Sequence, residues 1–539
     1  MTSVSSFSSN NIAVIGAGPA TVYLLAAICR EKKPFNGTVT IFESSAVIGR
    51  GTPYNSYSSQ YKMLSNLRSE EIPELHVPFA RWCENNFIDI PHTIIPRYLL
   101  GQYLEAAFHY YCHELESKAQ LKVQLVSRCE ITRIEPTDNQ SFLVYNHSQP
   151  AGEFKQIIIN TGHGAINDNL AARKESDAGV TFLSSPYPLQ RVLGSNIRNI
   201  AIRGASLSAI DCALAVAQKK GYFESVRHRL RYTARAPLQI TMYSTTGRFP
   251  SPWFASLDLQ SDIEAKLGDM VGEATTICLQ KLFKAGFTDF LAHYAPSVYQ
   301  QVHYKNIEQT VTYLLSNRQK LSVDTLLKVE FLSHLPDTGT GPACQENWQG
   351  VLECFGNVLH CYSHMLSQQD LQCYEEVLKP FIAKANAALP SQSAAKIHAL
   401  LQCGALTIKQ CEISREDFEQ LATSANEQSE PLYVDCTSGD NLDGSAAMIQ
   451  PLLHAGLLQQ KTKSTDNKPD LKVSRHFQAI GEDGLSRIFI GAPSLLNSTL
   501  LTLPGLEVND FLSTAIAQVL CGQQITDSTP MVSTTSPTQ

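Results

Sequence analysis

The chain has 539 residues, of which 43% are hydrophobic and 17% are charged, and its formal net charge is −7. This length exceeds one ordinary hydrophobic core, so we expect two or three domains. The acidic balance and the lack of a long Lys/Arg run exclude a general polyanion-binding surface, so neither nucleic acid nor a membrane is an expected partner. The 14 cysteines are scattered and never occur as CxxC, which predicts reduced thiols in a cytoplasmic protein and no metal site.

The first predicted strand is the apolar run Ile12–Ile15, which is typical of a parallel strand buried on both faces. A turn with Gly16 and Gly18 follows, and then a helix whose free N–H groups favour a pyrophosphate. The next strand ends in Glu43, an acid placed to accept hydrogen bonds from a ribose hydroxyl. Thr21 stands in the place of the usual third glycine. We therefore predict a dinucleotide site lined by Gly16, Gly18, Pro19, Ala20 and Glu43.

The rest of this first domain alternates between helical and strand patterns. Apolar residues at helical spacing predict a helix over 97–118, and apolar runs predict strands near 121–125, 141–146 and 156–160. The last strand stops at the small-residue turn Thr161-Gly162. Such a turn brings the backbone back toward a bound dinucleotide, so both of its residues are predicted to contact the cofactor.

A second strand–turn–helix pattern begins near Asn199 and keeps only Gly204 of the usual glycines, with Ser206 in the second place. The turn still consists of small residues, so a phosphate can approach its backbone. The strand over 239–244 is followed by hydroxyl side chains and Arg248, which suit a 2′-phosphate and favour NADPH over NADH. An ordinary surface arginine after a strand is the alternative, so NADH stays open. The residues predicted to hold this cofactor are Gly204, Ser206, Leu207, Ser208, Asp211 and Arg248.

Two nucleotide units in one chain predict two cofactors, a flavin and a nicotinamide, that exchange electrons. The expected fold class is α/β, with two three-layer Rossmann-like dinucleotide-binding domains and a mostly helical insertion. The predicted parts are a disordered N-terminus (1–10), the first part of an FAD-binding domain (11–165), an NAD(P)H-binding domain (166–257), a helical substrate subdomain (258–400), the last part of the FAD-binding domain (401–522) and a disordered tail (523–539).

The order of these motifs resembles the two-dinucleotide-domain flavoproteins, and more narrowly the bacterial FAD-NAD(P)-binding family that includes amino-acid N-hydroxylating monooxygenases. The matching residues are spread over most of the chain but are sparse between 260 and 400. They are specific for the superfamily and less specific for the reaction. They comprise Gly16-Ala-Gly18-Pro19, Glu43, Gly49-Arg-Gly51-Thr-Pro-Tyr54, Arg97 with the helix that follows it, Thr161-Gly162-His163, Ser208-Ala-Ile-Asp211 and Ile490-Gly491.

The resemblance implies a catalytic role for Asn66, which matches an asparagine beside the reactive edge of the flavin in flavin monooxygenases. Its amide would orient the flavin's oxygen adduct or the nicotinamide, and a capping asparagine in a loop is the alternative. Arg68 departs from a lysine that family monooxygenases often carry nearby, which leaves this local role open. His163 would bind cofactor or substrate or be structural, and Arg97 would meet a phosphate or start a helix. The other cofactor-binding residues implied are Gly49, Gly51, Tyr54 and Gly491.

The mechanism implied by the resemblance uses NADPH to reduce FAD, after which the reduced flavin and O₂ form a C4a-hydroperoxide. A small-molecule substrate, an amino acid or a small amine, would take the distal oxygen on its nitrogen. This chemistry needs no protein nucleophile, in keeping with the lack of a convincing Ser/His/Asp signature. Two other interpretations stay open: an NAD(P)H-dependent flavin oxidoreductase without oxygen transfer, and a flavin-binding protein that has lost catalysis.

Overall fold

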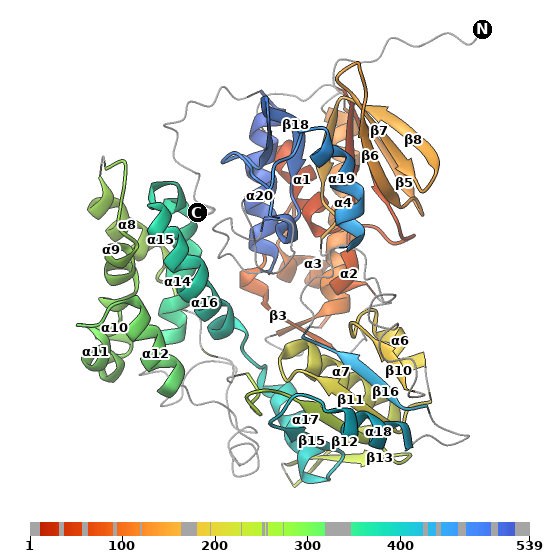
Figure 1. The fold of residues 1–539 in the computed structure, drawn as a ribbon, viewed down its shortest axis with the longest axis vertical. Coiled ribbons are helices and arrows are strands. Elements are labelled where there is room, and N and C mark those ends of the chain that lie inside the picture. Colours follow the sequence, from red (N-terminus) through yellow and green to blue (C-terminus); the bar gives the residue numbers. More distant parts are fainter. Residues whose placement is uncertain are drawn as a thin grey trace. The chain divides into compact units, whose positions relative to one another are not determined.

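The computed structural model contains two compact units, each assembled from its own secondary-structure elements (Figure 1). Among the described residues, the first unit comprises 11–162, 443–496 and 505–522, and the second comprises 180–437. No helix among the described residues is long and apolar enough to cross a membrane. The described residues are 11–31, 37–55, 63–89, 94–118, 121–162, 180–194, 196–227, 229–250, 254, 257–272, 274–317, 347–423, 430–437, 443–461, 470–496 and 505–522.

The first unit is built around a six-stranded sheet. In sheet order its strands are β17 (Gln478–Gly481), β18 (Gly484–Ile490), β9 (Gln156–Ile159), β1 (Asn11–Ile15), β2 (Gly37–Glu43) and β5 (Leu121–Ser127). Neighbouring strands run parallel except β17 and β18, which are antiparallel. Residues Ile12–Ile15 of β1 are at most 4% exposed, which explains why this inner strand is a continuous apolar run.

Three long helices of the first unit pack together: α1 (Pro19–Arg30), α4 (Arg97–Lys118) and α20 (Gly505–Leu520) (Figure 1). Residues Ala20–Ile28 of α1 are buried, and Arg30 at its end forms an ion pair of 2.6 Å with Asp510 on α20. The first unit also contains α2 (Gly51–Tyr54), β3 (Leu64–Arg68), η1 (Ser69–Glu71), α3 (Phe79–Asn85), β4 (Ile94–Pro96), α19 (Asp443–His454) and η8 (Pro493–Leu495).

A small antiparallel sheet of three strands completes the first unit. It consists of β6 (Ile131–Pro136), β7 (Phe142–Asn146) and β8 (Gln149–Phe154). Phe154 on β8 meets Phe42 on β2 edge to face, with ring centroids 5.7 Å apart, so the small sheet lies against the large one.

The second unit contains a five-stranded, wholly parallel sheet. In sheet order its strands are β10 (Thr181–Leu183), β16 (Leu432–Asp435), β11 (Asn199–Arg203), β14 (Gln239–Tyr243) and β15 (Leu406–Lys409). Its apolar core includes residues of α7 (Leu207–Lys220) and α17 (Ser391–Gln402). Apart from a helical segment between β14 and β15, the other elements are α6 (Leu189–Gly194), α18 (Arg415–Thr423) and a hairpin of β12 (Gly221–Val226) and β13 (Arg229–Ala234).

The expected boundary near residue 401 differs from the structure. The sequence predicts 401–522 as part of the first domain, but β15 and β16 pair with β14 and β11 of the second sheet. Helix α17, which the sequence predicts as part of the helical insertion, packs into the core of the same unit. The periodicity of a short strand indicates that it is a strand but carries no information on its partner, which is why the sequence misplaced these elements.

The helical insertion therefore lies in the chain between β14 and β15 and has an apolar core of its own. Phe283, Phe287 and Phe355 pack together at its centre and are fully buried. The α/β fold class with two Rossmann-like units and a helical segment is confirmed. The insertion's elements are α8 (Gln260–Val271), α9 (Leu279–Phe283), η3 (Lys284–Thr288), α10 (Leu291–Tyr294), α11 (Pro296–Val302), α12 (Ile307–Asn317), α14 (Trp348–Leu359), η6 (His360–Met365), α15 (Gln368–Cys373), η7 (Tyr374–Leu378) and α16 (Lys379–Asn386).

Candidate dinucleotide-binding sites

The first glycine turn connects β1 to α1. Gly16 adopts φ +102°, and its N–H donates to the carbonyl oxygen of Phe42 at 2.8 Å. A Cβ at this position would overlap the carbonyl oxygen of Asn160, so only glycine fits the turn. Gly18 is the N-cap of α1 and offers no side chain to its N–H groups. An uncapped helix N-terminus beside a glycine turn can hold a pyrophosphate.

Glu43 lies beside this turn at the end of β2. Its carboxylate accepts hydrogen bonds from the N–H groups of Ala17 at 2.9 Å and Ser45 at 2.8 Å. These two bonds fix the orientation of the carboxylate, which keeps lone pairs for further donors. Glu43 is therefore placed where it could accept a ribose hydroxyl.

The segment that contains Gly49 and Gly51 approaches the first turn backbone to backbone. The N–H of Gly49 donates to the carbonyl of Ala17 at 2.6 Å. A Cβ on Gly18 would lie 3.3 Å from the Cα of Gly51, and a Cβ on Gly51 would lie 2.7 Å from Cδ of Pro19. The structure thus brings Gly49 and Gly51 together with the glycine turn, whereas their contact with a flavin stays a prediction.

Tyr54 and Arg97 lie close to one another at the start of α4. Burial raises the pKa of the Tyr54 phenol, and the Arg97 cation offsets part of this rise. Arg97 donates from its backbone N to Met63 at 2.9 Å and from Nε to the carbonyl of Leu64 at 3.2 Å. These bonds tie β3 to the helix start, whereas the phosphate contact of Arg97 stays a prediction. Asn66 lies within β3, and its catalytic role is likewise a prediction.

Asn160, which the sequence analysis did not single out, links Thr21 with two predicted site residues, Gly16 and Gly491. Its Nδ2 donates to the hydroxyl of Thr21 at 3.0 Å, and that hydroxyl donates to the carbonyl of Gly16 at 2.6 Å. A Cβ on Gly491 would overlap Oδ1 of Asn160. The available signal was a polar residue directly after the apolar run 157–159 and before a Thr-Gly turn.

The turn after Asn160 contains a glycine with a positive φ. Gly162 adopts φ +64°, and a Cβ there would meet no atom of the described residues within 4 Å. Its carbonyl accepts a hydrogen bond of 2.6 Å from the hydroxyl of Ser494. Thr161 belongs to the same turn, whereas His163 lies outside the described residues.

The second glycine turn has the geometry of the first although it has lost two glycines. Gly204 adopts φ +108°, and its N–H donates to the carbonyl of Tyr243 at 2.7 Å. Ser206, the N-cap of α7, has φ −84° and ψ −174°, close to the −84° and −166° of Gly18. Leu207 and Ser208 begin α7. Small residues thus maintain a turn whose N–H groups can hold a second pyrophosphate.

The structure gives Asp211 a partner within the protein. Its Oδ2 accepts a hydrogen bond of 2.9 Å from the phenol of Tyr187. This bond connects α7 to the segment before α6. The cofactor contact of Asp211 stays a prediction.

The strand beside the second turn ends differently from its counterpart in the first unit. The N–H of Gly16 bonds to the carbonyl of Phe42, and the N–H of Gly204 bonds to the carbonyl of Tyr243. The residues that follow these two acceptors, Glu43 and Ser244, therefore occupy equivalent positions in the two units. The second unit thus has a hydroxyl where the first has a carboxylate. Sequence reasoning missed Ser244 because the register between the strands was needed to match the two positions.

Among the described residues of the second unit, Arg203 and Lys409 end strands, and Arg248 follows the end of β14. Arg203 pairs with Glu412 at 3.1 Å and Asp435 at 3.2 Å. Lys409 pairs with Asp417 at 2.6 Å. Arg248 follows β14, is exposed and forms no ion pair with any described residue. Arg248 is therefore the cation at this edge that remains available to an anionic ligand.

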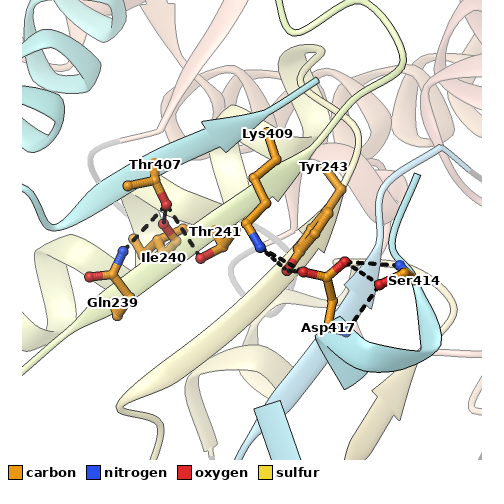
Figure 2. Close-up of polar contacts among 8 residues, drawn as sticks. All are labelled: Gln239, Ile240, Thr241, Tyr243, Thr407, Lys409, Ser414 and Asp417. Atoms are coloured by element: carbon orange, nitrogen blue, oxygen red, sulfur yellow. Dashed lines mark hydrogen bonds and ion pairs between the residues drawn. The ribbon is translucent and has the colours of Figure 1, made fainter. Parts of the chain in front are cut away.

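Figure 2 shows Lys409, Tyr243 and Ser414 converging on Asp417. Burial raises the pKa of the Asp417 carboxyl, but hydrogen bonds from Lys409 and Ser414 outweigh it and hold the pKa below its usual range. In the same view Thr407 of β15 lies within hydrogen-bond reach of β14. The cluster fixes the edge strand β15 and the start of α18 to β14. No group of three or more His, Cys, Asp or Glu side chains placed to bind a metal occurs among the described residues.

Comparisons with known proteins agree with this geometry. Residues 13–164 match the model of the FAD-NAD(P)-binding family. The uncharacterized protein YdhS of Escherichia coli K12 is 28% identical over 261 residues, which are 45% of this chain and 47% of that protein. The match thus spans about half the length of this curated relative.

Two solved structures cover nearly the whole chain. The FAD-bound cadaverine monooxygenase of the desferrioxamine pathway from Erwinia amylovora matches with a TM-score of 0.50 and 11% identity, over 99% of this chain and 100% of that one. The ornithine N-hydroxylase of Kutzneria sp. 744 matches with a TM-score of 0.48 and 12% identity, over 95% and 99% of the two chains. The former likeness shows a shared fold. The similarity to the FAD-NAD(P)-binding family is carried by residues 13–164, which include the first glycine turn.

Proposed function

We propose that this protein is an FAD-dependent monooxygenase that uses NADPH and hydroxylates the nitrogen of an amino acid or a small amine. One observation carries the proposal: two glycine turns of matching geometry stand in separate units, and the strands beside them end in different residues, Glu43 and Ser244. Two turns with the same backbone geometry favour the binding of two dinucleotides. The different residues beside them favour two different dinucleotides, one in each unit.

The first glycine turn with α1 and Glu43, here called the first cradle, fits FAD. Gly16 and Gly18 leave room for a pyrophosphate at the N-terminus of α1, and Glu43 is oriented for a ribose. In the proposed complex, Thr161, Gly162 and Gly491 lie along the flavin half. The cofactor or substrate contact of His163 stays a prediction from the sequence. When bound, FAD supplies the capacity to accept a hydride and to pass one oxygen atom of O₂ to a substrate.

The second glycine turn with α7 and Ser244, here called the second cradle, fits NADPH better than NADH. Ser244 presents no carboxylate to repel a 2′-phosphate, and Arg248 is an exposed cation with no ion pair among the described residues. A guanidinium binds a phosphate through charge-assisted, bidentate hydrogen bonds. Ser206 and Ser208 would donate to the pyrophosphate at the start of α7.

The chain's own contribution to the reaction is to bind, orient and exclude water. The family resemblance assigns Asn66, on β3, the task of orienting the nicotinamide and the reacting oxygen through its amide. Arg97 fixes β3 through its bond to Leu64, so it holds the strand that carries Asn66. An amine substrate is proposed because the motifs resemble N-hydroxylating enzymes and because the fold is shared with a cadaverine monooxygenase.

Anaerobic stopped-flow spectroscopy tests this function. NADPH is expected to bleach the oxidised flavin, and O₂ should then give a transient that absorbs at a shorter wavelength than the oxidised cofactor. A screen of amino acids and small amines should find one that stimulates NADPH consumption and yields a product heavier by one oxygen atom. Reoxidation straight to hydrogen peroxide with every substrate would favour an oxidoreductase without oxygen transfer. No bleaching by either nicotinamide would favour a flavin-binding protein without catalysis.

A further inference from the structure

The segment Gly49–Tyr54, here called the bridging segment, lies between the first glycine turn and α4. On one side, the N–H of Gly49 bonds to Ala17, and Gly51 packs against Gly18 and Pro19. Its only helical part is α2, a single turn of four residues. One helical turn does not hold its own shape, so outside contacts must fix the position of this segment.

On its other side, the bridging segment is fixed to α4. A Cβ on Gly49 would lie 2.8 Å from Cα of Glu105, and a Cβ on Gly101 would overlap the carbonyl oxygen of Tyr54. Between these contacts, Arg50 donates from Nε at 2.9 Å and from Nη2 at 2.5 Å to Oε2 of Glu105. Arg50 is the one charged residue of the segment.

We infer that Arg50 is a positioning residue for FAD: its ion pair with Glu105 holds the bridging segment over the pyrophosphate turn. This inference rests on the proposed function, since it requires FAD in the first cradle. Without the ion pair, the segment loses the contact of its one charged residue with α4, and part of the binding free energy of FAD goes into ordering it. FAD affinity then falls although no atom that touches FAD has been removed.

The ion pair is partly buried and keeps contact with water, so we expect it to contribute little to the stability of the fold. The side chains of Arg50 and Glu105 are 18% and 29% exposed. The same pair borders the turn at which the cofactor is proposed to bind. Loss of the ion pair should therefore separate two measurements: the FAD affinity changes, and the unfolding midpoint of the apoprotein does not.

The test is a double-mutant cycle on the full chain with Arg50→Ala, Glu105→Ala and the double variant. Titration of each apoprotein with FAD, followed by flavin fluorescence, gives the affinity. Each single change is expected to weaken binding about tenfold, or about 1.4 kcal/mol, and the double change no further. Arg50→Lys should recover part of the affinity because it keeps the charge. The matched control is Arg133→Ala, which breaks an ion pair of 2.9 Å with Glu135 elsewhere in the first unit.

The outcomes separate this inference from the proposed function. If Glu105→Ala binds FAD like wild type while Arg50→Ala is weak, Arg50 acts by direct contact and the positioning role is wrong. Equal affinity of wild type and both single variants overturns the inference alone. A wild-type protein that takes up no FAD overturns the proposed function and this inference together. If Arg50→Ala fails to fold, Glu105→Gln removes the charge with little change in shape and should show the same tenfold loss.

Discussion

Thr21 shows how a single residue compensates for a missing glycine. Its buried hydroxyl donates to Gly16 and accepts from Asn160, so it fills the space under the turn and satisfies two polar groups. Thr21→Val keeps the shape but leaves a buried carbonyl and a buried amide unpaired, which should cost about 2 kcal/mol of unfolding free energy. Urea unfolding of the apoprotein measures this cost. Thr21→Ser retains the hydroxyl, so its free energy of unfolding should fall clearly less than that of Thr21→Val. An equal fall in the two variants would contradict the hydrogen-bond argument.

Ser244 is the residue that we expect to set coenzyme preference. It corresponds to Glu43, so Ser244→Glu should restore an acceptor for a ribose 2′-hydroxyl and repel a 2′-phosphate. The affinity for NADPH should fall about tenfold, or about 1.4 kcal/mol, while NADH is favoured. Rates of flavin reduction at several concentrations of each coenzyme give the measurement. Ser225→Glu, at an exposed position of β12, controls for the added charge; an unchanged NADPH preference in Ser244→Glu would rule this assignment out.

At the scale of elements, the local sequence predicted the nucleotide turns well and the later strands poorly. The first turn follows from β1, Gly16 and Gly18, because a buried strand followed by a glycine turn has few structural solutions. The second turn survives with Ser206 because its backbone needs a positive φ only at Gly204. Such requirements are local, so the sequence reveals them.

Strands β15 and β16 fall outside what local patterns predict. Each has four residues, and their pairing with β14 and β11 crosses the whole helical insertion. The register that matches Ser244 with Glu43 likewise depends on hydrogen bonds between strands. Contacts over long sequence separations have no signature in the residues on either side, which explains both omissions.

The 3₁₀ element η6 makes the helical segment sensitive to acid. Burial lowers the pKa of His360 to about 4, and a backbone contact with Asn357 opposes this shift. An unfolded histidine titrates near pH 6.5, so the stability from the neutral folded form is complete above that pH and is lost as the pH falls toward 4. The free energy of unfolding should drop by about 2 kcal/mol between pH 7 and pH 5.

Urea titrations at a series of pH values measure this drop, and His360→Gln should flatten the profile over the same range. The exposed His303 provides the matched control, since His303→Gln should keep the wild-type slope. A wild-type slope in His360→Gln would assign the acid sensitivity to other groups.

At the scale of the whole molecule, each unit builds its cradle from its own strands and helix. The first turn is shaped by Phe42 and Asn160, and the second by Tyr243 and Thr437, with no residue shared between them. The chemistry proposed for the chain requires both cofactors, but their binding does not require one another. The two binding events should therefore be separable by mutation.

An Asp substitution at either N-cap position should weaken the binding of one cofactor and leave the binding of the other intact. Ser206→Asp places a carboxylate at the start of α7, where it caps the helix well but repels a pyrophosphate, and Gly18→Asp does the same at α1. The added Cβ at Gly18 would lie 3.3 Å from Gly51, so a small shift there is expected. Ser206→Asp should bind FAD normally and lose NADP⁺ affinity at least tenfold, about 1.4 kcal/mol, whereas Gly18→Asp should lose FAD and keep NADP⁺. Flavin fluorescence and calorimetric titration with NADP⁺ measure the two affinities, and loss of both cofactors in either folded variant would show that the cradles are not independent.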